Sequence, residues 1–211
     1  MASPEQLIEG FKRFREHHFT IDNALYSTLV ARGQTPKTLV VSCCDSRVDP
    51  ALVLDCAPGD LFVIRNVANL VPPAESSSSG HHGTSAALEF GVRNLKVEHI
   101  IVFGHAQCGG IRTLVETGEA NDPESYIDDW MRLAMSARAD VLQEMPEATL
   151  EEKIHACELR AILVSLRNLV TFPWIRERVE NGTLTLHGWY FDIEAGLLLQ
   201  YDAAAGTFKA L

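Results

Sequence analysis

The sequence has no apolar run long enough to cross a membrane and no excess of positive charge. Its apolar runs fall well short of the roughly 18 consecutive residues that a membrane span needs. Lysine and arginine number 18 against 28 aspartate and glutamate residues, which gives a formal net charge of −10. Proteins that coat DNA or bind anionic membranes need clustered basic residues. The composition therefore predicts neither nucleic acid nor a membrane as a partner.

The sequence also predicts neither a disulfide framework nor a signal peptide. Its five cysteines are an odd number, and a chain of 211 residues can bury a sizeable core without covalent cross-links. The first residues lead into a charged amphipathic stretch and not into the apolar segment of a signal peptide. We therefore expect a cytoplasmic protein with reduced thiols. Metal binding or catalysis is then the first role to test for the cysteines.

The remaining composition is that of an ordinary globular protein, with 46% hydrophobic and 22% charged residues. The length favours one domain over two. Apolar residues recur at helical spacing from Pro4 to about Arg32, and Pro36 ends that region. We expect residues 1–211 to form a single domain, with a helical arm over residues 1–35.

Short apolar runs alternate with segments of helical spacing through the rest of the chain. The predicted strands are Thr38–Ser42, Leu61–Arg65, His99–Gly104, Leu184–Phe191 and Leu197–Tyr201. The predicted helices are Thr84–Lys96, a segment from Ile111, Glu124–Met145 and Leu150–Leu169. This order predicts an α/β fold: a mainly parallel central β-sheet flanked by helices, with a C-terminal antiparallel strand pair. In such sheets, sites form beyond the carboxyl ends of the strands.

Two cysteine motifs lie at predicted strand ends. His105 and Cys108 are three residues apart at a strand-to-helix turn, a spacing that lets an imidazole and a thiolate bind one ion. His-x-x-Cys alone fits a structural role equally well. Cys43, at the end of the first predicted strand, supplies a third ligand. Two cysteines and one histidine form the ligand set of a catalytic zinc whose fourth position stays open.

Asp45 and Arg47 add a charged pair to the first motif. In an extended segment they point to the same face as Cys43, while Cys44 points to the other face, where we expect a small buried thiol. A carboxylate beside a metal either binds the metal or accepts a proton from metal-bound water. A guanidinium two residues further on can hold that carboxylate ionised. A solvated Asp–Arg pair is the alternative for either residue alone.

Together the motifs resemble the signature of the β-class carbonic anhydrases. The resemblance rests on Cys43-x-Asp45-x-Arg47 followed by His105-x-x-Cys108, with matching flanks at Ser42–Val48, Arg65–Asn69 and Gly104–Gly110. It extends from the N-terminal helix to His187-Gly188-Trp189, nearly the whole chain. The resemblance implies a zinc lyase that reversibly hydrates carbon dioxide to bicarbonate and a proton.

The family pattern also implies the roles of individual residues. Cys43, His105 and Cys108 would bind one zinc ion per chain, and zinc-bound hydroxide would attack CO2. Asp45 would orient the hydroxide, and Arg47 would fix Asp45. Members of the family are dimers or higher assemblies. We therefore expect a homodimer or tetramer in which the arm over residues 1–35 packs on a partner subunit.

Two further expectations concern the negative charge that develops in the reaction and the pH dependence of the activity. The backbone N–H groups of Gly109 and Gly110, at a predicted helix start, are candidates to stabilise developing negative charge. Two thiolates cancel the formal charge of zinc, so they acidify water less than three imidazoles do. We therefore expect an activity that rises with pH from neutral to alkaline conditions.

Some family members rest in a closed state, in which the equivalent aspartate binds zinc. In that subset a bicarbonate pocket is built from a Trp, an Arg and a Tyr, and the matching places here hold Val40, Arg65 and Phe191. Because two of the three residues differ, we predict the open form at neutral pH, with water as the fourth ligand. Asp45 would be a metal ligand only in a closed state.

Two other functions remain compatible with the same motifs. Some relatives hydrolyse carbon disulfide or carbonyl sulfide, and a non-catalytic zinc-binding assembly protein would keep the fold. Every expected ligand and dyad residue is present, which argues against the second alternative. His81 and His82 lie in a polar loop and are candidates to relay protons from the metal to buffer.

Overall fold

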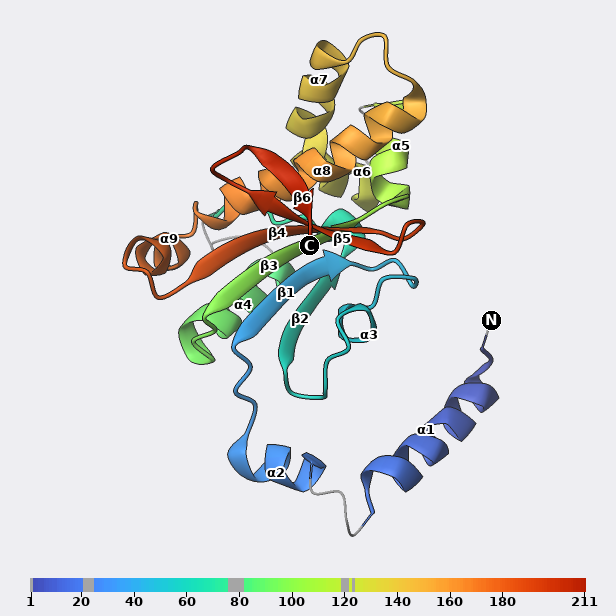
Figure 1. Ribbon diagram of the computed structural model, residues 1–211, viewed down its shortest axis with the longest axis vertical. Coiled ribbons are helices and arrows are strands. Elements are labelled where there is room, and N and C mark those ends of the chain that lie inside the picture. The colour runs from blue at the N-terminus through green and yellow to red at the C-terminus, as the bar shows by residue number, and fades with distance from the viewer. Residues whose placement is uncertain (1, 21–24, 76–81, 119–121, 123) are drawn as a thin grey trace. The chain divides into compact units, whose positions relative to one another are not determined.

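The computed structural model describes residues 2–20, 25–75, 82–118, 122 and 124–211 (Figure 1). Contacts divide the chain into two compact units, Met1–Thr35 and Pro36–Leu211. The boundary falls where the sequence places the end of the helical arm. The prediction of a single domain, and of an arm that packs on a partner subunit, stays a prediction.

The first unit contains two helices, α1 (Pro4–His18) and α2 (Leu25–Arg32). Helix α1 begins at a capping box, because Ser3 accepts a hydrogen bond from the backbone N–H of Gln6 while the Gln6 side chain accepts one from Ser3. Every residue of α1 is at least partly exposed, including the apolar side chains of Leu7 and Phe11, which are 63% and 59% exposed. Helix α1 thus presents apolar surface that its own unit leaves uncovered.

The second unit is built on one mixed sheet of six strands, in the order β2-β1-β3-β4-β5-β6. The first four strands in this order run parallel, and β5 and β6 continue the sheet antiparallel (Figure 1). The strands are β1 (Thr38–Cys43), β2 (Leu61–Asn66), β3 (His99–His105), β4 (Thr185–Asp192), β5 (Leu197–Asp202) and β6 (Thr207–Ala210). This confirms the predicted fold class, to which the structure adds β6 as a further antiparallel strand.

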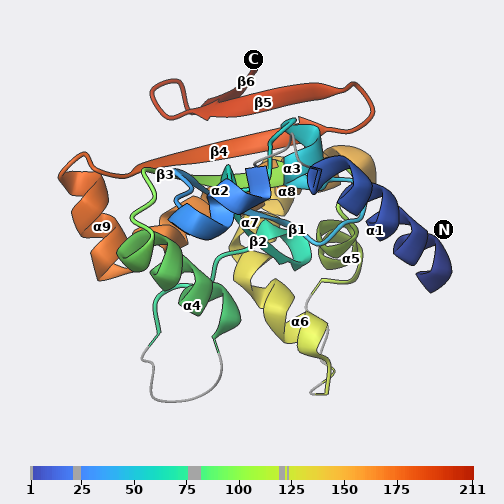
Figure 2. The ribbon, with the colours of Figure 1, turned by 90° about the horizontal axis from the view of Figure 1, so that it is seen from below.

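Helices surround the sheet, and Figure 2 shows β5 and β6 on one side of this unit with α4 and α6 on the opposite side. The helical segments are α3 (Pro50–Val53), η1 (Val67–Asn69), α4 (Gly83–Glu89), η2 (Phe90–Asn94), α5 (Gly109–Thr117), α6 (Tyr126–Met131), η3 (Arg132–Ala134), α7 (Met135–Glu144), α8 (Leu150–Leu169) and α9 (Pro173–Glu180). The prediction of one continuous helix over Glu124–Met145 is wrong, because the 3-10 segment η3 separates α6 from α7. Among the described residues, no helix has the length and apolarity that crossing a bilayer requires.

Helix α8 packs closely against β3 and β4 and also contacts α5. Two glycines allow this approach. A Cβ atom at Gly104 would lie 2.7 Å from Ile162 Cδ1, and one at Gly188 would lie 2.9 Å from Ile162 Cγ2. Close packing of this kind leaves no room for an added methyl group. Helix α8 is therefore held at the carboxyl end of β3, where the two cysteine motifs lie.

Candidate metal centre

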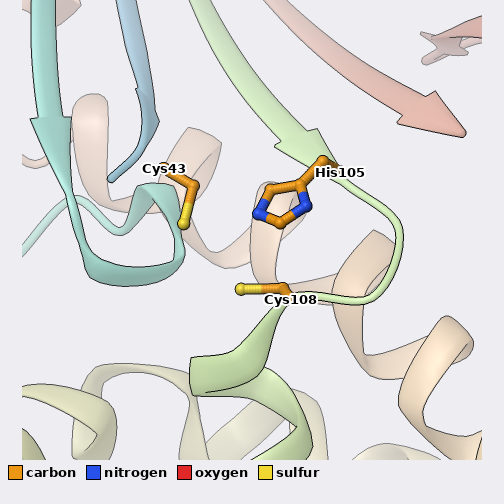
Figure 3. Close-up of side chains that lie close together, drawn as sticks. All are labelled: Cys43, His105 and Cys108. Carbon is orange, nitrogen blue, oxygen red and sulfur yellow. The ribbon is translucent and has the colours of Figure 1, made fainter. Parts of the chain in front are cut away.

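The three predicted metal ligands lie where two neighbouring parallel strands end and the following helix begins. Cys43 is the last residue of β1, His105 is the last residue of β3, and Cys108 is the N-cap of α5. Because β1 and β3 pair in parallel, their carboxyl ends lie at the same edge of the sheet. One potential ligand atom from each residue lies within 4.8 Å of the others, and all three residues are buried. Figure 3 shows the two sulfur atoms and the imidazole ring facing one another.

The histidine is held in the tautomer that a metal needs. Its Nδ1 lies 2.8 Å from the carbonyl oxygen of Ala106. Because a carbonyl oxygen only accepts, Nδ1 carries the proton and Nε2 presents a lone pair. Nε2 is buried and has no hydrogen-bond partner among the described residues. A buried lone pair without a partner is costly, so the cluster of one imidazole and two thiols fits a zinc ion.

The backbone around the two thiols favours negative charge. The sulfur of Cys108 accepts hydrogen bonds from the N–H groups of Gly110 and Ile111, at the N-terminus of α5. Cys43 accepts a hydrogen bond from Cys108, which lowers the pKa of Cys43 and raises the pKa of Cys108. Of the two thiols, Cys43 is therefore the one that loses its proton more readily, and binding of a divalent cation requires both to be deprotonated.

Gly110 also has a packing role. A Cβ atom at this position would lie 2.8 Å from Val67 Cγ1, whereas a Cβ atom at Gly109 would meet open space. The N–H of Gly110 is directed at the sulfur of Cys108. The proposed part of Gly109 and Gly110 in stabilising an anion stays a prediction.

Asp45 and Arg47 form a bidentate ion pair beside the cluster. Arg47 Nε donates to Asp45 Oδ1 at 2.9 Å, and Nη2 donates to Oδ2 at 2.7 Å. The backbone N–H of Arg47 donates to Oδ1 as well. These bonds lower the pKa of Asp45 to about 2. Both oxygens of Asp45 are therefore engaged, and among the described residues the metal-ligand group contains only Cys43, His105 and Cys108.

Arg47 also connects the two strand-end loops. Its Nη2 donates to the backbone oxygen of Gln107 at 3.0 Å. Gln107 has a φ of 58°, in the left-handed region, and its side chain donates to Glu194. The sequence predicted no role for Gln107, whose only signal is its place between His105 and Cys108.

Arg65 anchors the first loop from the neighbouring strand β2. Its Nε donates to the backbone oxygen of Cys43 at 2.9 Å, and its Nη2 donates to that of Asp45 at 2.7 Å. Its Nη1 forms an ion pair with Asp49, also at 2.9 Å. The guanidinium thus holds the backbone on both sides of Cys44. The sequence pattern places Arg65 in a flanking motif and in a bicarbonate pocket, and does not predict its contact with the loop after β1.

The other two positions that match the family's bicarbonate pocket, Val40 and Phe191, hold apolar side chains. Val40 is fully buried in a cluster with Ile101 and Phe103. Phe191 stacks on Phe103 with ring centroids 6.4 Å apart. The prediction of the open form agrees with this placement and stays a prediction.

The remaining thiols differ partly from expectation. The prediction that Cys44 is buried is wrong: Cys44 is exposed, because β1 ends at Cys43 and Cys44 lies in the loop that follows the strand. Cys56 lies in the loop after α3, and Cys157 is buried in α8. His82 precedes α4, and His81 lies outside the described residues.

Comparisons with known proteins agree with the fold and the cluster. The family model described as carbonic anhydrase matches residues 38–198. The carbonic anhydrase of Synechocystis sp. is 37% identical over 206 residues, which cover 98% of this chain and 74% of the relative. The structure of the β-carbonic anhydrase CcaA superposes with a TM-score of 0.90 at 37% identity, covering 98% of this chain and 91% of that one. A tetrameric β-carbonic anhydrase of Sordaria macrospora gives a TM-score of 0.75 at 29% identity, covering 98% of this chain and 95% of that one.

The chain therefore belongs to the carbonic anhydrase family and, within it, to the β class of these enzymes. The resemblance seen in two short motifs is thus confirmed over nearly the whole chain and in its fold.

Proposed function

We propose that this protein hydrates CO2 reversibly to bicarbonate and a proton, using one zinc ion per chain held by Cys43, His105 and Cys108. The observation that carries the proposal is the buried cluster of two thiols and one imidazole at the carboxyl ends of β1 and β3. Membership of the carbonic anhydrase family supports the same reaction.

The chain's own groups prepare this site for a metal. When bound, zinc lowers the pKa of water and so supplies a nucleophile near neutral pH. The bond from Nδ1 to Ala106 keeps the Nε2 lone pair of His105 free for the metal. The amides at the start of α5 partly offset the rise in the pKa of Cys108 that Cys43 and burial cause, and so would favour its thiolate once a metal takes the proton's place. The positions of all three donors are therefore set before a metal arrives.

Asp45 would accept a hydrogen bond from the attacking group, and Arg47 would orient Asp45. Because the pKa of Asp45 is held at about 2, its carboxylate is ionised at neutral pH and can accept a hydrogen bond from the attacking group. Arg47 fixes both oxygens of this carboxylate and so fixes its direction. The backbone N–H of Gly109, where an added Cβ atom would meet no described atom within 4 Å, is our candidate to stabilise the negative charge of the product.

We infer that the fourth zinc position is left to solvent and not filled by Asp45 at neutral pH. The support is that Arg47 already engages both carboxylate oxygens. An Asp45 ligand would have to exchange these charge-assisted bonds for the metal.

Self-association as a homodimer or tetramer is part of the proposal. The exposed apolar side chains of α1, and the tetrameric relative from Sordaria macrospora, support it. Sedimentation of the full chain tests it, and a monomer at micromolar concentration would contradict it. A cytoplasmic location remains the expectation for the five free thiols.

A stopped-flow assay of CO2 hydration on purified protein, with zinc counted per chain, tests the function. Removing zinc with a chelator should abolish hydration, and adding zinc back should restore it. Cys108→Ala should lose both zinc and activity. Cys56→Ala, which changes a half-buried thiol outside the cluster, should retain both.

A stoichiometric zinc ion without CO2 hydration would overturn the proposal. Hydrolysis of carbon disulfide or carbonyl sulfide by the same protein would then identify the substrate class. No activity on any of the three substrates would favour a non-catalytic assembly protein.

A further inference from the structure

A buried carboxylate on α8 contacts the backbone of Cys108, the N-cap residue of α5. Glu158 lies on α8 and is only 4% exposed. Its Oε1 accepts a hydrogen bond from the backbone N–H of Cys108 at 2.8 Å. Charged residues are almost never buried unless their polar atoms are satisfied. The burial of Glu158 is therefore explained by the hydrogen bonds that its two oxygens accept.

The second oxygen of Glu158 is held by another buried residue. The hydroxyl of Tyr190 on β4 donates to Glu158 Oε2 at 2.7 Å, and Tyr190 is 1% exposed. On the other side, His155 Nδ1 lies 3.0 Å from the same hydroxyl. Both carboxylate oxygens are thus fixed, one by the metal-ligand turn and one by the sheet.

The N–H that Glu158 accepts is one that the helix itself does not satisfy. Cys108 is the N-cap of α5 and has extended backbone angles, with φ −68° and ψ 116°. Its N–H therefore has no partner within α5, and it is buried. Glu158 is the group that satisfies it, and this bond fixes the orientation of the peptide that carries the Cys108 side chain.

The packing of α8 makes this support rigid. Ile162, one turn after Glu158 on α8, packs against Gly104 and Gly188, where added Cβ atoms would overlap it. The backbone of α8 therefore lies close to the sheet, and Glu158 has little freedom to move away from Cys108.

We propose that Glu158 is a positioning residue for the metal centre, and that Tyr190 positions Glu158. The inference rests on the proposed zinc site. Glu158 holds the first turn of α5 so that the sulfur of Cys108 stays directed at Cys43 and His105. Groups that orient metal ligands in this way commonly change metal affinity by about 10-fold to 100-fold when removed.

The rate of zinc release from the holoenzyme to a chelator tests the proposal without relying on activity. Glu158→Ala removes the acceptor and should release zinc at least about 10-fold faster than the native protein. Glu158→Gln keeps an oxygen that accepts from Cys108 and an amide that donates to Tyr190, so its release rate should stay near the native value. Tyr190→Phe keeps the ring and removes the hydroxyl, and it should give an intermediate rate.

Ser165→Ala is the matched control, because Ser165 is also a buried polar residue of α8 that accepts a backbone N–H, that of Val71. It should lower stability without changing zinc release. Native release rates in both Glu158→Ala and Tyr190→Phe would overturn the inference, as would equal acceleration by Ser165→Ala. If Glu158→Ala does not fold, native release from Tyr190→Phe alone overturns it. A native protein that binds no zinc would instead refute the proposed function.

Discussion

At the scale of single residues, Arg47 connects the two halves of the proposed zinc site. It grips both oxygens of Asp45 on the loop after β1 and the backbone oxygen of Gln107 on the loop after β3. Its hydrogen bonds are the largest cause of the low pKa of Asp45. The Arg47 side chain thus fixes the direction of the Asp45 carboxylate and keeps this carboxylate ionised.

Removing this guanidinium should change the pH dependence of activity. In Arg47→Ala the pKa of Asp45 should rise from about 2 toward the ordinary value near about 3.9. The native carboxylate stays ionised as the pH falls to 4, whereas the variant begins to take up a proton between about pH 5 and pH 4. We expect activity about 100-fold below native at neutral pH, because Asp45 stays ionised but loses the partner that fixes its direction, and misplacing a group by about 1 Å can cost this much.

Bicarbonate dehydration measured from pH 7 to pH 4, with zinc content monitored in parallel, tests this prediction. The ratio of variant to native activity should fall as the pH is lowered. Arg112→Ala removes an arginine that pairs with Glu116 and Glu151 on the surface, and its ratio should stay constant. A constant ratio for Arg47→Ala would show that Arg47 does not set the protonation of Asp45.

The sequence predicted the site residues that lie close together along the chain and missed those that lie far apart along it. Cys43, Asp45 and Arg47 alternate within one short segment, and His105 and Cys108 are three residues apart, so local spacing was enough. Glu158 is separated from Cys108 by 50 residues, and nothing in the sequence around it distinguishes it from an exposed glutamate of an amphipathic helix. Only the packing of α8 against the sheet brings it to the metal-ligand turn.

At the scale of elements, the position of α8 depends on two glycines in the sheet. A Cβ atom at Gly188 would lie 2.9 Å from Ile162 Cγ2 and 3.0 Å from Leu166 Cδ1. Gly188→Ala should therefore lower the free energy of unfolding by about 1–3 kcal/mol, because overpacking a filled core displaces side chains and backbone.

Urea unfolding of the purified variants measures this effect. Gly83→Ala is the control, because a Cβ atom at Gly83, the first residue of α4, meets no atom of the described residues within 4 Å. Alanine in a helix is about 0.5–1 kcal/mol more favourable than glycine, so this control should match or exceed native stability. If Gly188→Ala were as stable as Gly83→Ala, α8 would not be in tight contact with β4.

Elements with a strong local signal were predicted closely. The bounds of β1, β2 and β3 differ from prediction by one residue, because each strand contains an apolar run, buried in β1 and β3 and mostly half-buried in β2. Helix α8 matches its predicted range and begins at the capping box of Thr149 and Glu152. Helix α9 and strand β6 were missed because both are short and carry little apolar pattern: α9 buries only Ile175, and Phe208 is the one half-buried residue of β6.

At the scale of the whole molecule, the two units carry different parts of the proposed function. The unit Pro36–Leu211 holds all three proposed zinc ligands, the Asp45–Arg47 pair and the Glu158–Tyr190 support. The unit Met1–Thr35 carries the exposed apolar side chains of α1. Zinc binding should therefore depend on residues of the second unit, and self-association should draw on the first.

The central claim is that two thiolates and one imidazole hold zinc while Asp45 stays with Arg47. X-ray absorption at the zinc edge of the holoenzyme at neutral pH tests it most directly. The account predicts two sulfur ligands at about 2.3 Å and two lighter ligands at about 2.0–2.1 Å, one of them from His105. Asp45→Asn should leave this spectrum unchanged. Fewer than two sulfur ligands, or a changed set of lighter ligands in Asp45→Asn, would contradict the account.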